Sequence, residues 1–314
     1  MSTGDVTAKV AIVGGGAMGS VFAGLFASAG HDVTIVSRPG AHLEAIRRTG
    51  LRVEGASGDR TVKVRALDAP PAETFDLIIL AVKATQVDAA ASSLGPMLGN
   101  GAPLLAMQNG LGAADILSRA VDPDRIAVGI AAAYGASVVA PGHARHAGMG
   151  LIQIGAAAGL PAERVAWIAD IWRQAGFRVE AAENIVSMQW EKLICNASFS
   201  APCALTGLTV GAALSDPALG PVCLAAGTEA FEIARAAGVV LSVTDPEAHI
   251  RAFADRVAGA KPSLLQDIEA GRPSEIDFIN GAVPRQAGRL GLRAPVNETL
   301  TALVKALEAR NARS

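Results

Sequence analysis

Cysteine is scarce in this sequence, and the cysteines present form no recognisable pattern. The 314 residues include three of them, Cys195, Cys203 and Cys223, with no C-x-x-C pair. Such a set provides neither a disulfide framework nor a zinc site, so we expect no bound metal. It is typical of a reducing compartment, which predicts a cytoplasmic protein whose cysteines fill the core.

Charged residues are also few. They make up 18% of the chain against 51% hydrophobic residues, with a net charge of −2 and an isoelectric point near 6.2. This composition excludes a disordered chain and argues against nucleic acid as a main partner. Any anionic ligand must therefore be held by a local site.

The sequence lacks a clear membrane span and a secretory signal. Two uncharged stretches, residues 10–30 and 193–215, are long enough to cross a bilayer. Glycines interrupt the first, and polar residues such as Asn196 and Ser198 lie in the second. The first nine residues also lack the basic start of a secretory signal. Since neither uncharged stretch is expected to span a bilayer, we expect no membrane partner.

A glycine-rich turn follows directly behind the apolar run at residues 10–13. Gly14, Gly16 and Gly19 have the spacing G-x-G-x-x-G, and an uncharged helix is expected over residues 20–29. These glycines permit a tight turn, close approach of a pyrophosphate and close helix–strand packing. The alternative is chance spacing in a chain with 34 glycines, which the flanking strand and helix disfavour. The pattern predicts a dinucleotide site formed by Gly14, Gly16, Ala17, Met18 and Gly19.

The second expected strand, residues 32–36, ends without the acidic residue that usually binds the ribose 2′-hydroxyl of NAD. Ser37 and Arg38 follow it instead. A hydroxyl and a guanidinium suit a 2′-phosphate, which predicts NADPH as the cofactor. The alternative is an ordinary surface arginine beside the turn Pro39-Gly40.

Two further apolar runs, residues 77–82 and 103–107, are typical of buried parallel strands. Lys83 follows the first and Asn109 follows the second. Ligands of an open parallel sheet bind at the carboxyl ends of its strands, so both residues are expected beside the cofactor. The alternative is that they are plain strand-end residues.

The remaining pattern divides the chain into two domains. A hairpin is expected over residues 51–64, a strand over 126–133 and an antiparallel segment over 134–155. From residue 184 onward the segments have helix length and no strand signal. The predicted fold class is therefore α/β: a Rossmann-like NADP-binding domain with a mostly parallel sheet (1–183), then an all-helical domain (184–314). Its alanine-rich helices are compatible with a homodimer or with internal packing.

The second domain begins with a helix that carries three polar side chains on one face. Lys192, Asn196 and Ser200 are spaced at i, i+4 and i+8. This stacks an ammonium, an amide and a hydroxyl. The alternative for Lys192 is a solvated surface pair with Glu191.

Five segments in order make the chain resemble the ketopantoate reductases (2-dehydropantoate 2-reductases) over nearly its whole length. They are the glycine turn with Ser37-Arg38, V-K-A-T-Q at 82–86, Q-N-G-L-G at 108–112, W-E-K-L at 190–193 with Asn196, and S-L-L-Q-D-I at 263–268 followed by E-I-D-F-I-N-G at 275–281. The resemblance implies NADPH-dependent reduction of 2-dehydropantoate to (R)-pantoate, a step towards pantothenate and coenzyme A.

The resemblance also implies residue roles. Lys192 is similar to the catalytic lysine that hydrogen-bonds the keto oxygen and supplies the proton, and a charged lysine suits a developing alkoxide. The other implied roles are contacts around the nicotinamide ribose and reacting centre for Lys83 and Asn109, substrate orientation for Asn196, carboxylate binding for Ser263, and binding of a substrate or cofactor hydroxyl for Glu275. Taken singly, Ser263 and Glu275 are equally explained as helix-start residues behind Pro262 and Pro273.

Two features depart from regular expectation. Ser200-Ala201 stands where the family usually has Asn-Pro, so the substrate pocket is altered, although Ser200 still offers a hydrogen bond. A different 2-oxo acid or 2-oxolactone is therefore an alternative substrate. A non-catalytic NADPH-binding sensor is a third interpretation, which Lys192 and Glu275 disfavour.

Pro284 lies in an expected helix and predicts a bend near Gly281.

Overall fold

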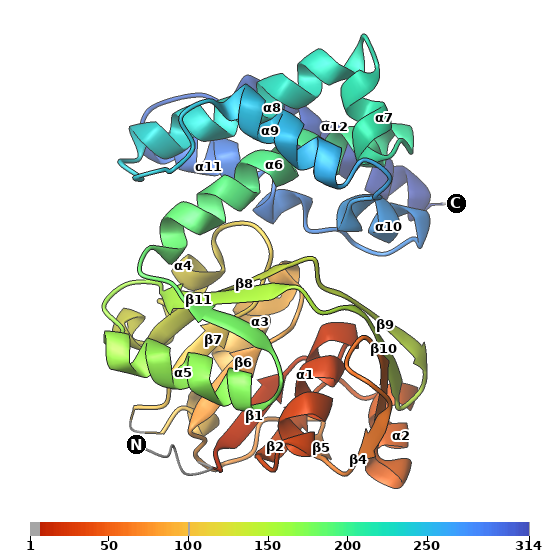
Figure 1. Ribbon diagram of the computed structural model, residues 1–314, viewed down its shortest axis with the longest axis vertical. Helices are drawn as coiled ribbons and strands as arrows, with labels where there is room; N and C mark the ends of the chain where they lie inside the picture. The colour runs from red at the N-terminus through yellow and green to blue at the C-terminus, as the bar shows by residue number, and fades with distance from the viewer. Residues whose placement is uncertain (1–6, 100, 314) are drawn as a thin grey trace. The chain divides into compact units, whose positions relative to one another are not determined.

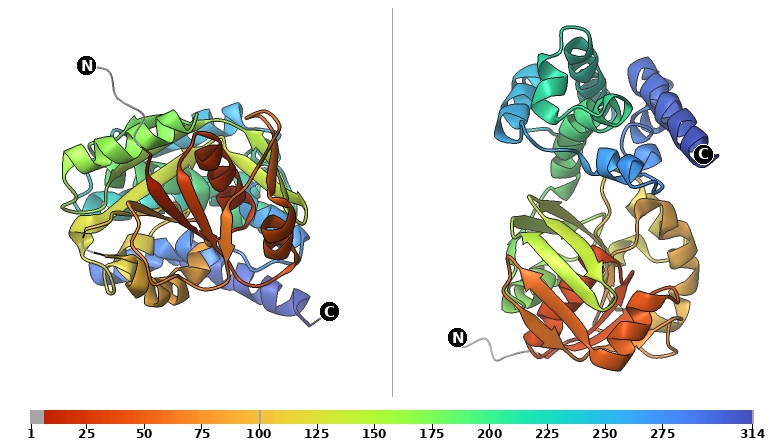
Figure 2. Two further views of the ribbon diagram at one scale, coloured as in Figure 1. Left: turned by 90° about the horizontal axis from the view of Figure 1, so that it is seen from below. Right: turned by 90° about the vertical axis from the view of Figure 1, so that its right-hand side faces the viewer.

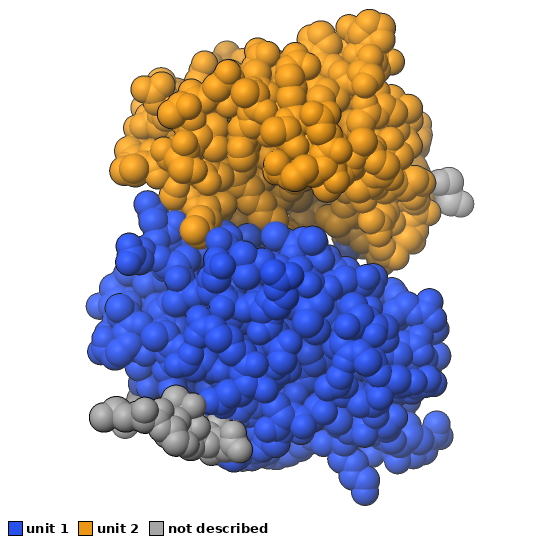
Figure 3. All heavy atoms as spheres, viewed as in Figure 1, with its two compact units in different colours: residues 1–108, 113–185 blue, residues 109–112, 186–314 orange. Residues whose placement is uncertain are grey.

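The computed structural model describes residues 7–99 and 101–313, and the chain forms two compact units. Unit 1 comprises residues 1–108 and 113–185, and unit 2 comprises residues 109–112 and 186–314 (Figure 3). The sequence prediction places residues 109–112 in the first domain, whereas their contacts group them with the helices of unit 2.

Unit 1 is built on an eight-stranded sheet in the order β12-β11-β8-β7-β6-β1-β2-β5 (Figure 1). Its strands are β1 (Lys9–Val13), β2 (Asp32–Val36), β5 (Arg65–Leu67), β6 (Leu77–Leu80), β7 (Leu104–Ala106), β8 (Ile126–Ala132), β11 (Leu151–Ala156) and β12 (Arg178–Ala181). Neighbouring strands run parallel except for the β8–β11 pair. The predicted mostly parallel sheet is confirmed.

Helices cover both faces of this sheet. They are α1 (Ala17–Ser28), α2 (Ala41–Thr49), α3 (Val87–Ser93), α4 (Ala113–Leu117) and α5 (Ala162–Gln174), with 3₁₀ turns η1 (Ala84–Gln86), η2 (Gly95–Met97) and η3 (Pro123–Arg125). In β1, Val10 and Ile12 join the core cluster that contains residues of α1 and α5, whereas Ala11 and Val13 join the cluster that contains residues of α3 and α4. Successive side chains of a strand point to opposite faces, so a strand covered on both sides is apolar throughout.

A second sheet of four strands belongs to the same unit (Figure 2, right). Its order is β4 (Arg60–Val62), β3 (Leu51–Gly55), β10 (His143–Gly148) and β9 (Gly135–Ala140). The antiparallel β3–β4 pair confirms the predicted hairpin, and β9–β10 is antiparallel as expected. The sequence did not predict that β10 runs parallel to β3.

Helix α1 packs against both sheets of unit 1. It contacts β1 and β2 of the large sheet and β3, β4, β9 and β10 of the small one, and eight of its 12 residues are buried. A Cβ at Gly24 would overlap the side chain of Val53 on β3. A helix buried nearly all round must be apolar, which explains the uncharged stretch at residues 10–30. Within the described ranges no helix has the length and apolarity that a membrane span requires.

Unit 2 consists of helices and connecting loops, which confirms the predicted all-helical region; no strand occurs in residues 186–313, the part of this region that the structure describes. The helices are α6 (Ile185–Thr206), α7 (Val210–Ser215), α8 (Leu219–Ala236), α9 (Pro246–Arg256), α10 (Ser263–Glu269), the 3₁₀ turn η4 (Ile276–Phe278), α11 (Ala282–Arg289) and α12 (Pro295–Asn311). The core includes Leu193, Ile194 and Phe199 of α6, together with Cys203 and Cys223, which are fully buried.

The segment after Glu275 is interrupted near Gly281, as Pro284 led us to expect. The turn η4 ends at Phe278, and α11 begins at Ala282. Pro284 therefore occupies the first turn of α11, where the missing N–H has no intrahelical partner to lose. The proline begins a new helix here and does not kink an existing one.

Candidate functional site

The glycine turn of unit 1 is shaped by contacts that leave no room for side chains. Gly14 has a φ of +109°, and a Cβ there would lie 2.6 Å from the backbone nitrogen of Val82. A Cβ at Gly19 would overlap the carbonyl oxygen of Gly14. A Cβ at Gly16 would meet nothing within 4 Å, and this residue is exposed. The turn is thus closed towards the sheet and open at Gly16, the position where a pyrophosphate would approach the start of α1.

The parallel register brings the other predicted cofactor residues to the same sheet edge. Val13 of β1 pairs with Val36 of β2 and with Leu80 of β6. Ser37 follows β2 and lies beside the turn, since a Cβ at Gly15 would be 3.0 Å from the Ser37 Cβ. The neighbouring Arg38 is exposed. Lys83 follows the end of β6 and precedes η1.

Gln108, to which the sequence analysis gave no role, holds the end of β6. Its buried Nε2 donates to the carbonyl oxygens of Leu80 at 2.8 Å and Val82 at 2.9 Å. This fixes the backbone just before Lys83. Its sequence signals were its place directly behind an apolar strand and at the start of the Q-N-G-L-G segment, and neither indicated this contact.

A second missed residue, His42, joins the start of α2 to the start of α1. Its Nδ1 accepts from the Gly142 N–H at 3.0 Å, and its Nε2 lies 2.9 Å from the Ser20 Oγ. Since Nδ1 accepts, Nε2 carries the proton and donates to Ser20. Burial lowers the pKa of His42, which favours this neutral form.

In unit 2 the predicted residues Lys192, Asn109 and Glu275 come together. Lys192 Nζ donates to Asn109 Oδ1 at 3.0 Å. Burial lowers the pKa of Lys192 to about 8, and the negative charge of Glu275 opposes that shift. The arrangement provides an ammonium held by the Asn109 amide oxygen and a balancing carboxylate. Glu191, which precedes Lys192 and was the alternative partner for it, accepts from the Ser242 N–H at 2.6 Å and from the Ser242 Oγ–H at 2.7 Å.

The segment that carries Asn109 is anchored on the segment that follows Glu275. The Leu111 N–H donates to the Phe278 carbonyl oxygen at 2.9 Å. Gly110 has a φ of +78°, and a Cβ there would overlap the same oxygen. Backbone therefore packs on backbone, which requires glycine at position 110.

The other predicted substrate residues lie on two helices of unit 2. Asn196 and Ser200 follow Lys192 at four-residue intervals on α6, where Asn196 is half-buried and Ser200 is buried. Ser263 begins α10 and is exposed; among the described residues no hydrogen bond joins it to Lys192, Asn196 or Ser200.

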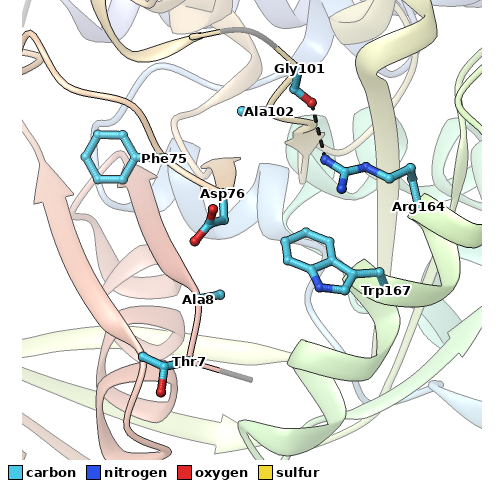
Figure 4. A pocket seen from close by; sticks show the side chains of 8 residues that line it. All are labelled: Thr7, Ala8, Phe75, Asp76, Gly101, Ala102, Arg164 and Trp167. Carbon is cyan, nitrogen blue, oxygen red and sulfur yellow. Dashed lines mark hydrogen bonds between the residues drawn. The ribbon is translucent and has the colours of Figure 1, made fainter. Parts of the chain in front are cut away.

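A hollow of about 400 Å³ in unit 1 lies away from all of these residues (Figure 4). Its lining precedes β1, β6 and β7 or belongs to α5, and comprises Thr7, Ala8, Phe75, Asp76, Gly101, Ala102, Arg164 and Trp167. It therefore opens at the amino ends of the strands, opposite to the edge where parallel sheets bind ligands. None of the predicted site residues lines it.

Comparison with known proteins agrees with this architecture. Residues 10–159 match the model of the ketopantoate reductase PanE/ApbA family, and residues 184–308 match that of its C-terminal part. The 2-dehydropantoate 2-reductase of Archaeoglobus fulgidus is 32% identical over 96% of this chain and 98% of its own.

Solved structures of similar proteins cover almost the whole chain. A PanE/ApbA family ketopantoate reductase from Ralstonia eutropha is 36% identical, with a TM-score of 0.88 over 96% of this chain and 99% of that one. A D-mandelate dehydrogenase in complex with NADH is 25% identical, with a TM-score of 0.86 over 96% and 99%.

The fold and the matching motifs define an oxidoreductase with a dinucleotide-binding sheet unit and a helical unit. The chain belongs to the ketopantoate reductase PanE/ApbA family.

Proposed function

We propose that the protein catalyses NADPH-dependent reduction of 2-dehydropantoate to (R)-pantoate, a cytoplasmic step towards pantothenate and coenzyme A. The observation that carries the proposal is the hydrogen bond from Lys192 Nζ to Asn109 Oδ1, with Glu275 close enough to influence the Lys192 charge. A proton donor held in this way suits reduction of a carbonyl, in which oxygen gains a proton as carbon gains a hydride.

The glycine turn fits a dinucleotide, because it is closed towards the sheet and open at Gly16. Gly14, Gly16 and Gly19, with Ala17 and Met18 at the start of α1, would hold the pyrophosphate. Ser37 and Arg38 would hold the 2′-phosphate, and Lys83 the region of the nicotinamide ribose. Bound NADPH supplies the hydride.

Lys192 would bind the keto oxygen and transfer its proton to that oxygen as the alkoxide forms. With a pKa of about 8, the side chain is mostly protonated at neutral pH and yet releases a proton more readily than an ordinary lysine. Asn109 would keep Nζ oriented. Glu275 would keep the ammonium charged and bind a hydroxyl of the substrate or cofactor.

The remaining residues would position the substrate. Asn196, one turn beyond Lys192, would orient the 2-oxo acid, and Ser200 would donate or accept a further hydrogen bond. Ser263 would bind the carboxylate.

Oxidation of NADPH by the purified protein, followed with 2-dehydropantoate beside a panel of other 2-oxo acids, tests the proposal. Efficient turnover of 2-dehydropantoate with little turnover of the panel supports it. Lys192→Ala should bind NADPH normally and lose turnover. Tight NADPH binding without turnover of any panel member would favour a non-catalytic sensor.

A second candidate keeps the fold and Lys192 but changes the substrate to another 2-oxo acid or a 2-oxolactone. Two observations favour it. Ser200-Ala201 replaces the usual Asn-Pro, and the similar D-mandelate dehydrogenase acts on a different 2-hydroxy acid, by its name. Turnover confined to a panel member other than 2-dehydropantoate would select this candidate.

A further inference from the structure

Arg285 connects the two loops of unit 2 that carry Asn109 and Glu275. It lies on α11, and its Nη1 donates to the Asp277 carbonyl oxygen at 2.8 Å. Its Nη2 donates to the Leu111 carbonyl oxygen at 2.9 Å. Leu111 is two residues beyond Asn109, and Asp277 is two residues beyond Glu275. One guanidinium thus hydrogen-bonds both segments, two residues away from each predicted site residue.

The residues around the Arg285 guanidinium leave room for these two hydrogen bonds. Gly112 has a φ of +112°, and a Cβ there would lie 3.0 Å from Arg285 Nη2. The guanidinium also lies 5.7 Å from the centroid of the Phe278 ring. The Asp277 carboxylate is held by Lys305 at 3.0 Å, so Arg285 contacts the backbone of Asp277 while the lysine takes its side chain.

We propose that Arg285 is a positioning residue, which fixes the spacing of the two loops and thereby the orientation of Lys192 through Asn109. This inference rests on the proposed function, in which Lys192 is the proton donor. A planar guanidinium presents donors in a fixed fork and reaches two carbonyl oxygens at once. A lysine at this position has one compact ammonium on a flexible chain, so it keeps the charge but not the fixed separation between two donor nitrogens.

Loss of the fork has a specific consequence for Lys192. When the 109–112 loop drifts, Asn109 Oδ1 no longer accepts from Lys192 Nζ, and the ammonium loses a hydrogen bond that its charged form prefers. The pKa of Lys192 then falls. The reacting geometry loosens as well, and a misplacement of this kind lowers kcat by about 10- to 100-fold.

The decisive variant is Arg285→Lys, since it preserves the positive charge and separates geometry from electrostatics. We expect kcat to fall by about 10- to 100-fold and the basic limb of the pH profile to move to lower pH. The dissociation constant for NADPH should change far less than kcat, because the glycine turn that would hold the pyrophosphate lies in unit 1. Arg289→Ala, one turn further along α11 and bonded to Gln286, is the matched control and should keep both kcat and the pH profile.

A readout independent of turnover uses acetylation of the Lys192 amine, measured by mass spectrometry over a pH series. In Arg285→Lys and Arg285→Gln the apparent pKa of Lys192 should fall relative to the wild-type protein. An unchanged or raised pKa would overturn the inference, as would wild-type kcat in Arg285→Lys. If the wild-type protein reduces no 2-oxo acid, the proposed function fails, and the acetylation curves still decide the role of Arg285.

Discussion

At the scale of single residues, the charge of Lys192 is set by two opposing effects. Burial lowers its pKa from the ordinary 10.5 to about 8, and Glu275 acts in the other direction. The ammonium form therefore predominates at neutral pH, and its population declines as the pH rises through about 8. If the ammonium is the proton donor, the rate of reduction should decline over the same range.

Replacing Glu275 by glutamine removes the charge that raises the pKa of Lys192. We expect the basic limb of the kcat/KM profile to move from about pH 8 to lower pH. Initial rates with the preferred 2-oxo acid over a pH series measure this shift. Glu269→Gln alters only an exposed ion pair with Lys261 and should retain the wild-type profile. A limb that stays in place in Glu275→Gln would contradict the assigned role.

Arg38 is expected to distinguish the two nicotinamide cofactors. Arg38→Ala should weaken NADPH binding by about 10- to 100-fold, the usual effect of losing a charged hydrogen bond, and should leave NADH binding nearly unchanged. Fluorescence titration with each cofactor gives the two dissociation constants. Arg48→Ala removes another exposed arginine, at the end of α2, and serves as the control. Equal weakening of both cofactors would remove the 2′-phosphate assignment.

At the scale of elements, the sequence predicts those helices and strands that form from residues close together in the chain. The run at residues 10–13, the glycine spacing and the uncharged helix behind it are local, and β1 and α1 form there as expected. The parallel pairing of β10 with β3 joins residues about 90 positions apart, such as Arg145 and Glu54, and has no local signal.

The same contrast holds for the candidate site. Helical spacing alone places Lys192, Asn196 and Ser200 together on α6. The hydrogen bond between Arg285 and Leu111 spans 174 residues, and neither residue type at its position indicates the other. His42 and Gln108 were missed for the same reason, because their partners are set by tertiary packing.

Gly110 is an element-scale constraint that can be tested by stability. Gly110→Ala places a Cβ at a φ of +78° and against the Phe278 carbonyl oxygen, so the free energy of unfolding should fall by about 2 kcal/mol or more. Gly288 on α11 has open space around its Cβ position and an ordinary φ. Gly288→Ala should therefore stabilise the protein by up to about 1 kcal/mol. Urea unfolding of both variants measures the difference, and equal effects would contradict the packing described for Gly110.

At the scale of the whole molecule, buried histidines connect stability to pH. Burial lowers the pKa of His31, His42 and His146 below the ordinary 6.5. The unfolded chain therefore binds more protons than the folded one when the pH falls below about 6.5, and the equilibrium moves towards unfolding.

Urea unfolding at about pH 8 and about pH 5.5 should show lower stability at the acidic value, where unfolded histidines are mostly protonated. His42→Asn removes one of these groups and should reduce the difference between the two conditions. A free energy of unfolding that is constant or higher at the acidic pH would contradict the assignment of neutral buried histidines.

The path of the chain between its two units has an evolutionary consequence. It passes from one unit to the other at residues 108–109, 112–113 and 185–186, so the loop that carries Asn109 is encoded in the middle of the sheet unit. Recombination between two genes near codon 185 would join Lys192 from one parent to Asn109 from the other. The hybrid would also need a Phe278 backbone that fits the foreign loop. Such a hybrid would form the hydrogen bonds from Lys192 to Asn109 and from Leu111 to Phe278 only if its two halves matched at this loop.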